Sequence, residues 1–289
     1  MSAGGAKLSI VLLTFNSAAS IGRTIRSLKG LSDDIHVVDS FSSDDTIAIC
    51  EAAGCKVIQH PFANYSAQRN WAIDNLPLAH DWQLHVDADE ELTPALRSAI
   101  AAIDLDRADA DGYIVGRKIV FMGKVLRFGA IAKTWHYRLF RAGYGRCEDR
   151  LYDQHFVSKG RVKRIAAFML DHQENSIGDW TARHNRWSDM EAEEMSAEDA
   201  TLPREGQVKA DPRGDAIARK RYAKGMYYRM PLCWRAFGYT FYRYVLRLGF
   251  LDGQPGFIYH MLQGFWFRLL VDAKLIERRM ARESAGPAA

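Results

Sequence analysis

The 289-residue sequence has few cysteines, and they follow no pattern typical of a metal site or a disulfide framework. The four of them, Cys50, Cys55, Cys147 and Cys233, include no C-x-x-C pair. This scarcity favours reduced thiols and a cytosolic setting over a disulfide-stabilised scaffold or a zinc site.

Two common phosphate-binding loops are also absent. The sequence contains neither a G-x-G-x-x-G stretch nor a Walker-type loop. The first would mark a dinucleotide-binding turn and the second a P-loop, so the sequence supports neither kind of site.

Long apolar runs are missing as well. The run 9–14 is too short for the core of a signal peptide, and we expect it to form a first strand. The aromatic C-terminal region is interrupted by charged residues such as Arg235, Arg243 and Arg247. It offers no stretch of about 18 apolar residues, which argues against a membrane-spanning helix.

Charge is divided unevenly along the chain. The overall net charge is +4, but residues 203–289 carry 16 Lys and Arg against 7 Asp and Glu, whereas residues 1–202 carry 23 against 28. An acidic front part and a basic, aromatic rear part indicate two roles on one chain. We expect a catalytic domain over residues 1–200, a loop or linker over 201–214 and amphipathic helices over 215–289.

The front part alternates strands with helices. Apolar runs at 9–13, 35–39, 56–59 and 82–86 are separated by helical patterns. This alternation of strands and helices predicts an α/β fold with a Rossmann-like, mainly parallel sheet and helices on both faces. Ligands of such sheets bind beyond the carboxyl ends of the strands, where Thr14, Asp39 and Asp87 are expected.

Two aspartates end the run at 82–86. Asp87 and Asp89 are one residue apart, so their carboxylates can point the same way where a strand ends. Hard oxygen donors of this kind suit Mg²⁺ or Mn²⁺ that also carries substrate phosphates.

Four motifs together resemble a known family. The stretches 9–16, 37–46, 67–70 and 86–90 resemble family 2 inverting glycosyltransferases of the GT-A fold. Within that family the chain is most similar to the bacterial subgroup of lipopolysaccharide-core and exopolysaccharide glucosyltransferases. The resemblance runs from about Leu8 to about Lys274 and implies a nucleotide-sugar donor, a divalent ion and inversion at the anomeric carbon.

The resemblance also implies roles for individual residues. Thr14, Asn16 and Asp39 would line the nucleoside pocket, and Arg69 would lie near the base or the diphosphate. Asp87 would face the ribose or the metal.

The same resemblance implies the metal ligands. Asp89 would hold Mg²⁺ or Mn²⁺ against the diphosphate, and a departing diphosphate gathers negative charge that a metal stabilises. His172, at the end of an apolar run, could complete the metal shell, although a lone histidine there can equally be a structural hydrogen-bonding residue.

The catalytic base is harder to assign. An inverting transfer needs one carboxylate that accepts the proton of the acceptor hydroxyl. Many relatives have Val-His-Glu where this chain has Tyr152-Asp153-Gln154, which removes the usual glutamate. We favour Asp149 as the base and take Asp153 as the alternative.

The C-terminal region predicts association with a membrane surface. Helices rich in Trp, Tyr, Phe and Arg fit the interface of an anionic leaflet. The same aromatic residues could instead pack onto the catalytic domain or form a face between two copies of the chain. No reader motif accompanies the basic residues, so we expect no nucleic acid partner.

These expectations combine into one functional hypothesis. The chain would be a peripheral enzyme on the cytoplasmic face of the inner membrane that moves a sugar from a nucleotide donor, a UDP-sugar in the first instance, to a lipid-linked glycan. One alternative is a sugar-phosphate nucleotidyltransferase, for which the stretch after the first strand lacks the Gly-rich basic loop. Another alternative is a non-catalytic membrane assembly protein with a GT-A-like fold.

Overall fold

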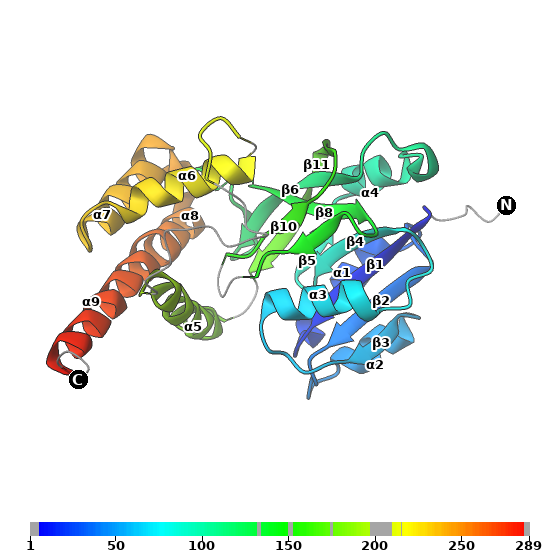
Figure 1. Cartoon of the computed structure of the whole chain (residues 1–289), viewed down its shortest axis with the longest axis horizontal. Coiled ribbons are helices and arrows are strands. Elements are labelled where there is room, and N and C mark those ends of the chain that lie inside the picture. The colour runs from blue at the N-terminus through cyan, green and yellow to red at the C-terminus, as the bar shows by residue number, and fades with distance from the viewer. Residues whose placement is uncertain are drawn as a thin grey trace. The chain divides into compact units, whose positions relative to one another are not determined.

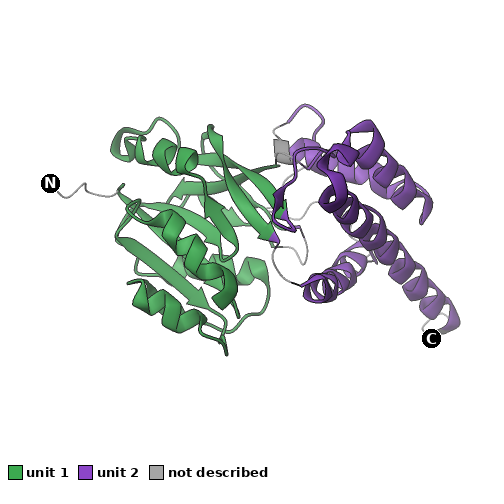
Figure 2. Cartoon of the chain, turned by 180° about the vertical axis from the view of Figure 1, so that it is seen from behind, with its two compact units in different colours: residues 1–120, 133–150, 154–172 green, residues 121–132, 151–153, 173–289 purple. Residues whose placement is uncertain are grey.

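A computed structural model describes residues 6–131, 134–149, 153–173, 176–196, 210–214 and 216–285 (Figure 1). The chain forms two compact units, which Figure 2 distinguishes by colour. Unit 1 comprises residues 1–120, 133–150 and 154–172, and unit 2 comprises residues 121–132, 151–153 and 173–289. Residues 201–209 of the expected linker lie outside the described residues.

Strands and helices alternate through the first part of unit 1, as the sequence predicts. In chain order the elements are β1 (Leu8–Thr14), α1 (Ala18–Leu28), β2 (Asp34–Asp39), α2 (Thr46–Ala52), β3 (Lys56–Gln59), α3 (Tyr65–Asn75), β4 (Trp82–Asp87), β5 (Glu90–Leu92), α4 (Pro94–Ala101), β6 (Gly112–Phe121), β8 (Thr134–Arg141), β9 (Gly145–Cys147), β10 (Phe156–Ser158) and β11 (Val162–Gln173).

One large sheet organises unit 1, with the strand order β3-β2-β1-β4-β8-β6-β11-β5. The four strands β3, β2, β1 and β4 are parallel. Their register aligns Thr14 with Asp39 across β1 and β2, and Leu13 with Asp87 across β1 and β4. The carboxyl ends of three neighbouring strands therefore lie at one edge of the sheet.

The expectation of a mainly parallel sheet is corrected by the structure, which has a mixed sheet. Beyond β4, the pairs β4–β8, β6–β8 and β5–β11 are antiparallel. Parallel strands need a long crossover, usually through a helix. No helix is described between β6 and β8, so these strands pair antiparallel.

Helices cover both faces of the parallel strands, as expected. Because side chains alternate along a strand, Leu8, Ile10 and Leu12 of β1 face one side and pack with α1, α2 and α4. Val11 faces the other side and packs with Ala72 of α3, the helix that crosses the near face of the sheet in Figure 1. Alternation within one strand thus forms two separate cores.

Local sequence signals explain where several helices begin and end. The side chain of Asn64 accepts a hydrogen bond from the Ala67 amide at 2.8 Å and caps α3, and Thr93 caps α4 in the same way. Gly54 follows α2 with φ of 81°, a conformation that glycine adopts without strain.

Unit 2 is mainly helical. Its elements are β7 (Lys124–Val125), α5 (Ile177–Ser196), α6 (Ala216–Tyr228), α7 (Trp234–Phe241), the π-helical segment Tyr242–Leu246, α8 (Gly253–Tyr259), the π-helical segment His260–Trp266 and α9 (Phe267–Ala285). Among the described residues, no helix combines the length and the apolar character that crossing a bilayer requires.

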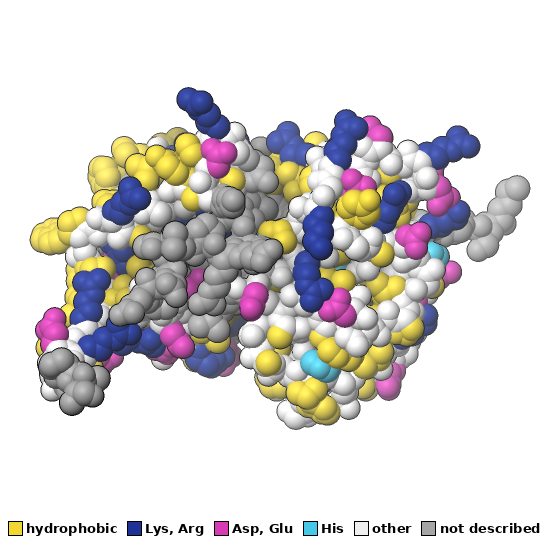
Figure 3. All heavy atoms as spheres, viewed as in Figure 1, with side chains coloured by type: hydrophobic (Ala, Val, Ile, Leu, Met, Phe, Trp, Pro, Cys, Tyr) yellow, Lys and Arg dark blue, Asp and Glu magenta, His cyan; other side chains and the backbone are white. Residues whose placement is uncertain are grey.

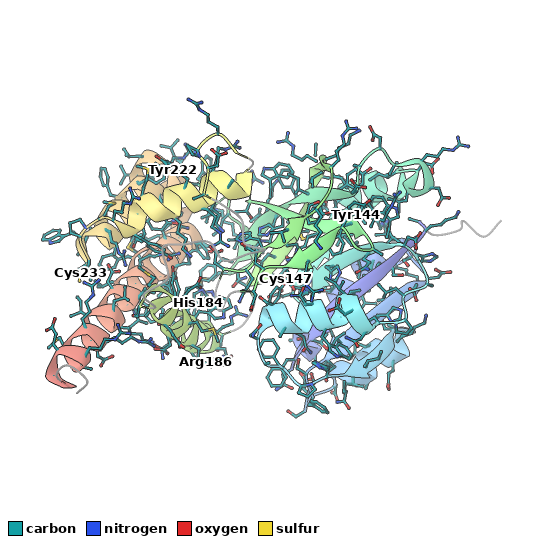
Figure 4. All side chains as sticks on the ribbon, viewed as in Figure 1. Tyr144, Cys147, His184, Arg186, Tyr222 and Cys233 are labelled. Carbon is teal, nitrogen blue, oxygen red and sulfur yellow. The ribbon has the colours of Figure 1, made fainter. Side chains whose placement is uncertain are left out.

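The interior of unit 2 mixes aromatic and charged side chains. Helix α5 packs on α9 through Ala192, Phe267 and Val271. His184, which lies on α5 with Arg186 in Figure 4, is buried with its ring stacked on Trp180 at a centroid distance of 3.4 Å. This burial lowers the pKa of His184 to about 4, so its imidazole is neutral at physiological pH and serves packing.

Candidate functional site

The carboxyl edge of β1, β2 and β4 in unit 1 collects the polar residues that the sequence singled out. Thr14 ends β1, Asp39 ends β2 and Asp87 ends β4. Thr14 and Asp39 are buried, whereas the Asp87 side chain keeps 24% of its surface exposed. At this edge, Thr14 and Asp39 are therefore buried polar residues, and the Asp87 carboxylate reaches solvent.

Asp39 is held by hydrogen bonds on both of its carboxylate oxygens. Thr14 Oγ1 donates to Asp39 Oδ2 at 2.8 Å, and the Ser42 amide donates to Oδ1 at 2.7 Å. Asn16 has a left-handed backbone conformation with φ of 46°, and its Oδ1 accepts from the Ser43 amide at 2.8 Å. These bonds tie the loop after β1 to the loop after β2.

Asp87 lies between two arginines. Arg69 of α3 is fully buried, and its guanidinium donates to Asp87 Oδ1 and, at 3.0 Å, to the Val86 carbonyl. Arg138 of β8 donates to Asp87 Oδ2 at 2.7 Å. Tyr65 Oη adds a further hydrogen bond to Oδ1 at 3.0 Å. Arg69 can therefore act on a ligand at this edge only through Asp87.

Arg138 also joins Asp87 to a second buried carboxylate. Its guanidinium donates to Glu90 Oε1 at 2.7 Å, while Glu90 Oε2 accepts from the Asp87 amide at 2.9 Å. Glu90 and Arg138 are both buried. Arg69, Asp87, Arg138 and Glu90 form an alternating chain of charges, called here the Asp87 network.

The pKa values of the two carboxylates in this network are shifted in opposite directions. Burial works against ionisation of Asp87, but Arg138 and Arg69 outweigh it and hold the pKa of Asp87 below its usual value. Burial raises the pKa of Glu90, and the charge of Asp87 adds to this, although Arg138 opposes it. Asp87 is thus the more firmly ionised of the two carboxylates, and its side chain is partly exposed to solvent.

Asp89 and His172, the expected metal ligands, lie together on unit 1. The His172 amide donates to the Asp89 carbonyl at 3.0 Å. The His172 ring contacts Glu91 Oε2 at 2.7 Å through Nε2 and Arg23 at 3.1 Å through Nδ1. Within the described ranges, no three His, Cys, Asp or Glu side chains converge on one point.

That geometry fits a metal shared with a substrate. Mg²⁺ is usually bound through one or two carboxylates together with substrate phosphates and waters, and not by a cage of protein ligands. Asp89 is half-buried and Glu91 and His172 are beside it. Asp89, with either neighbour, could hold a divalent ion whose other ligands are phosphate oxygens.

The two candidate bases have different surroundings. Asp149 of unit 1 is exposed and follows Glu148, which is buried and whose Oε2 accepts from the His155 amide at 2.9 Å. Asp153 belongs to unit 2, where it pairs with Lys220 at 3.0 Å and Lys224 at 3.2 Å. Asp149 is thus an exposed residue of unit 1, while Asp153 forms ion pairs with two lysines of unit 2.

Sequence comparison identifies the family. Residues 9–185, more than half of the chain, match the sequence model of glycosyl transferase family 2. The chain belongs to glycosyl transferase family 2. Among its curated relatives, an uncharacterized glycosyltransferase of Rickettsia felis is 37% identical over 153 residues, which are 53% of this chain and 50% of the relative. The chain thus spans about half the length of that relative.

A functionally named relative and two solved structures are more distant. The lipopolysaccharide core biosynthesis glycosyltransferase LpsC of Rhizobium meliloti is 26% identical over 195 residues, 65% of this chain and 71% of LpsC. TarS of S. aureus, solved as residues 1–349, is 14% identical with a TM-score of 0.42, covering 94% of this chain and 91% of the solved TarS chain. Glucosyl-3-phosphoglycerate synthase of Mycobacterium tuberculosis, solved with Mn²⁺ and UDP-glucose, is 22% identical with a TM-score of 0.30, covering 39% and 44%.

Sequence reasoning missed part of this family 2 site. It did not select Arg138, Glu90 or Tyr65, which complete the Asp87 network. One signal was present: Arg138 lies between Tyr137 and Leu139 in β8, and a charge that is buried in a strand needs a partner. The partner itself could not be named, because the pairing of β8 with β4 is not visible in the sequence.

The Asp87 network gives a stability prediction. Arg138→Met leaves Asp87 and Glu90 with one buried cation fewer, and breaking a buried pair on one side costs about 3–5 kcal/mol. We expect urea denaturation to show a loss of unfolding free energy in that range. Adding Glu90→Gln to the same variant should recover part of the loss.

Arg141→Met is the matched control, because Arg141 lies on the same strand and is also partly buried, with its guanidinium over the Trp82 ring. We expect it to lose about 1 kcal/mol or less. Equal stability of the Arg138 variant and the wild type would contradict the role given to the network.

Proposed function

We propose that this family 2 protein transfers a sugar from a nucleotide diphosphate donor to a glycan acceptor, with inversion and with the help of a divalent ion. The observation that carries the proposal is the carboxyl edge of β1, β2 and β4. There Thr14, Asp39 and Asp87 end three neighbouring strands, and Asp89 follows Asp87 by two residues. In open α/β sheets, ligands bind beyond this edge.

The donor would lie along this edge. Asn16 is exposed and would contact the nucleoside, while buried Asp39 and Thr14 would hold the two loops in place through Ser42. Asp87 presents an ionised carboxylate to the ribose or the metal, and Arg69 and Arg138 hold it in place from behind. Such prior positioning lowers the cost of ordering the site when the donor binds.

Asp89 would hold the divalent ion, with Glu91 and His172 next to it. The ion, when bound, would neutralise the charge that the departing diphosphate gathers. Asp89 and Glu91 bring carboxylate oxygens to this corner beside Asp87, and such oxygens are the ligands that Mg²⁺ prefers.

The transfer would run in a single displacement. The acceptor oxygen forms a bond to the anomeric carbon while the bond from that carbon to the diphosphate oxygen breaks, and the diphosphate leaves with the electron pair. The proton of the acceptor hydroxyl passes to a carboxylate. Asp149 is the favoured base because it is an exposed residue and follows Glu148 in the Glu-Asp pair typical of the wider family, and Asp153 is the alternative.

The acceptor class is proposed from relatives and from the charge of the chain. LpsC is named for lipopolysaccharide core biosynthesis. A lipid-linked glycan at the cytoplasmic face of the inner membrane would suit the basic, aromatic surface of unit 2, which is described below.

The donor proposal predicts metal-dependent nucleotide binding. We expect isothermal titration of the wild type with UDP to give heat in the presence of Mn²⁺ and little without it. Asp89→Ala should weaken binding at least tenfold by removing the main metal ligand. Asp33→Ala, at a side chain that is 90% exposed, should bind like the wild type. A wild type without heat would favour the non-catalytic alternative.

The choice of base predicts a separation of binding from turnover. With a panel of UDP-sugars and Mn²⁺, background donor hydrolysis should fall about 10²-fold or more in Asp149→Asn while UDP affinity stays unchanged. Asp153→Asn should keep most of its turnover. The reverse result would assign the base to Asp153. Turnover of a nucleoside triphosphate with a sugar phosphate, releasing pyrophosphate, would instead favour the nucleotidyltransferase alternative.

The surface of unit 2 supports the proposal that the protein binds to a membrane surface. Helix α7 buries Arg235, which pairs with Asp272 at 2.8 Å, and exposes Trp234, Phe237 and Phe241 on one face. Trp234 is 75% exposed. Soluble helices normally expose their charges and bury their aromatic side chains. A helix with the opposite arrangement is suited to an apolar environment outside the protein.

Neighbouring segments extend this face into one apolar surface. We call it the aromatic face: Trp234, Phe237, Phe241, Leu246, Phe250, Leu251 and Phe257, all exposed. Figure 3 shows hydrophobic side chains gathered over α6 and α7, and Tyr222, labelled on α6 in Figure 4, is also exposed. Exposed apolar side chains that gather on one part of a surface can mark an interaction site.

The positive charge of unit 2 favours an anionic bilayer as the partner of the aromatic face. Arg229 and Arg247 are exposed within this part of unit 2, and residues 203–289 carry a net charge of +9. A second copy of the chain would bring the same positive charge to the contact, whereas an anionic leaflet would attract it. Aromatic side chains at the height of the lipid headgroups would complete the anchoring.

The aromatic face predicts binding to vesicles. We expect the wild type to sediment with vesicles of phosphatidylcholine and phosphatidylglycerol, and much less with phosphatidylcholine alone. Combined Trp234→Ser, Phe237→Ser and Phe241→Ser should reduce binding at least tenfold, because each change removes an exposed aromatic ring.

Phe62→Ser, at a phenylalanine of unit 1 that is 55% exposed, is the matched control and should bind like the wild type. Circular dichroism checks that each variant is folded. Vesicle binding that survives the triple change would contradict the proposal, as would concentration-dependent dimers that the triple change abolishes without any binding to lipid.

A further inference from the structure

Unit 1 carries a hollow of about 210 Å³ between α1 and the start of α4. Arg23, Arg26 and Ser27 of α1 line one side, and Glu91 of β5 and Arg97 of α4 line the other. Pockets for drug-sized ligands usually exceed 300 Å³. This hollow therefore suits a small ligand or one chemical group of a larger ligand.

The charge of the lining is strongly positive. Besides Arg23 and Glu91, the lining contains the two guanidinium groups of Arg26 and Arg97. Glu91 is already in contact with His172 at 2.7 Å. In the part of the chain that the structure describes, no carboxylate forms an ion pair with Arg26 or Arg97. Guanidinium groups of this kind are well suited to binding phosphate oxygens.

Neighbouring hydrogen bonds fix the walls of the hollow. Ser27 Oγ donates to the Thr24 carbonyl at 2.7 Å and accepts from the Leu92 amide at 3.0 Å, which joins α1 to β5. Arg97 donates to the Lys29 carbonyl at 3.3 Å. The positive N-terminal end of α4, which begins at Pro94, lies at the same place and adds to the attraction for an anion.

The hollow is distinct from the donor edge. Helix α1 begins at Ala18, shortly after Thr14 ends β1. Arg26 lies eight residues further along, which at 1.5 Å per residue is about 12 Å down the helix. Arg23 lies between the two and reaches His172 at 3.1 Å, so the hollow borders the Asp89 corner without belonging to the nucleoside surface.

We propose that this hollow binds a phosphomonoester group or free phosphate. The two positive charges of Arg26 and Arg97 match a phosphate dianion, and planar guanidinium groups bind phosphate oxygens in pairs. The ligand is either inorganic phosphate or a phosphate carried on a sugar. The proposal concerns a site separate from the proposed donor and base residues, and it stands whether or not the chain transfers sugars.

Thermal unfolding of the full chain tests this at constant ionic strength set with chloride. Inorganic phosphate should raise the Tm of the wild type with saturation in the millimolar range, because a ligand that binds only the folded state stabilises it. Combined Arg26→Gln and Arg97→Gln should remove most of this shift. Arg161→Gln, at an exposed arginine of unit 1 that pairs with Asp109, should keep it.

Two further measurements exclude loss of folding as an explanation and distinguish the two possible ligands. Glu91→Gln removes the one negative charge of the lining and should tighten phosphate binding several-fold in isothermal titration, which loss of folding cannot imitate. Glucose 6-phosphate that binds more tightly than inorganic phosphate would identify a sugar-borne phosphate, and equal affinity would identify the phosphate group alone. A Tm shift that persists in the double variant, or that chloride reproduces, would overturn the proposal.

Discussion

The pairing of Asp87 with two buried arginines is the interaction on which the site in unit 1 depends. Asp87 ends the central strand β4, and its carboxylate lies between Arg69 from α3 and Arg138 from β8. Without these partners a half-buried carboxylate at this position would be costly, and with them it is held ionised. The edge of the sheet can thus hold an ionised carboxylate at a fixed place.

The mixed sheet makes this arrangement possible. The parallel strands β1, β2 and β4 align Thr14, Asp39 and Asp87 at one edge, but they supply no cation from the sheet itself. The antiparallel strand β8 lies directly beside β4 and brings Arg138 to Asp87. Unit 2 uses buried arginines differently: Arg235 pairs with Asp272 inside the unit and leaves the aromatic side chains of α7 on the surface.

Much of the fold could be predicted from the sequence, and less of the site could. The parallel strands and their helices follow from apolar periodicity, and the residues at the strand ends follow from the rule that carboxyl ends meet at one edge. The antiparallel half was not foreseen, since its strand pairing depends on contacts far apart in the chain. For the same reason the Arg138–Glu90 pair and the arginine-lined hollow at Arg23, Arg26 and Arg97 were missed. The family could be recognised from the sequence because four short motifs occur together and in order.

The central claim is that the corner formed by Asp87 and Asp89 binds a divalent ion together with a nucleotide diphosphate. A crystal structure of the full chain with UDP and Mn²⁺ tests it most directly, because the anomalous signal of manganese locates the ion. The account predicts an anomalous peak within about 2–2.5 Å of an Asp89 carboxylate oxygen, phosphate oxygens on its other side and the base near Asp39. A nucleotide bound elsewhere, or manganese away from Asp89, would contradict it.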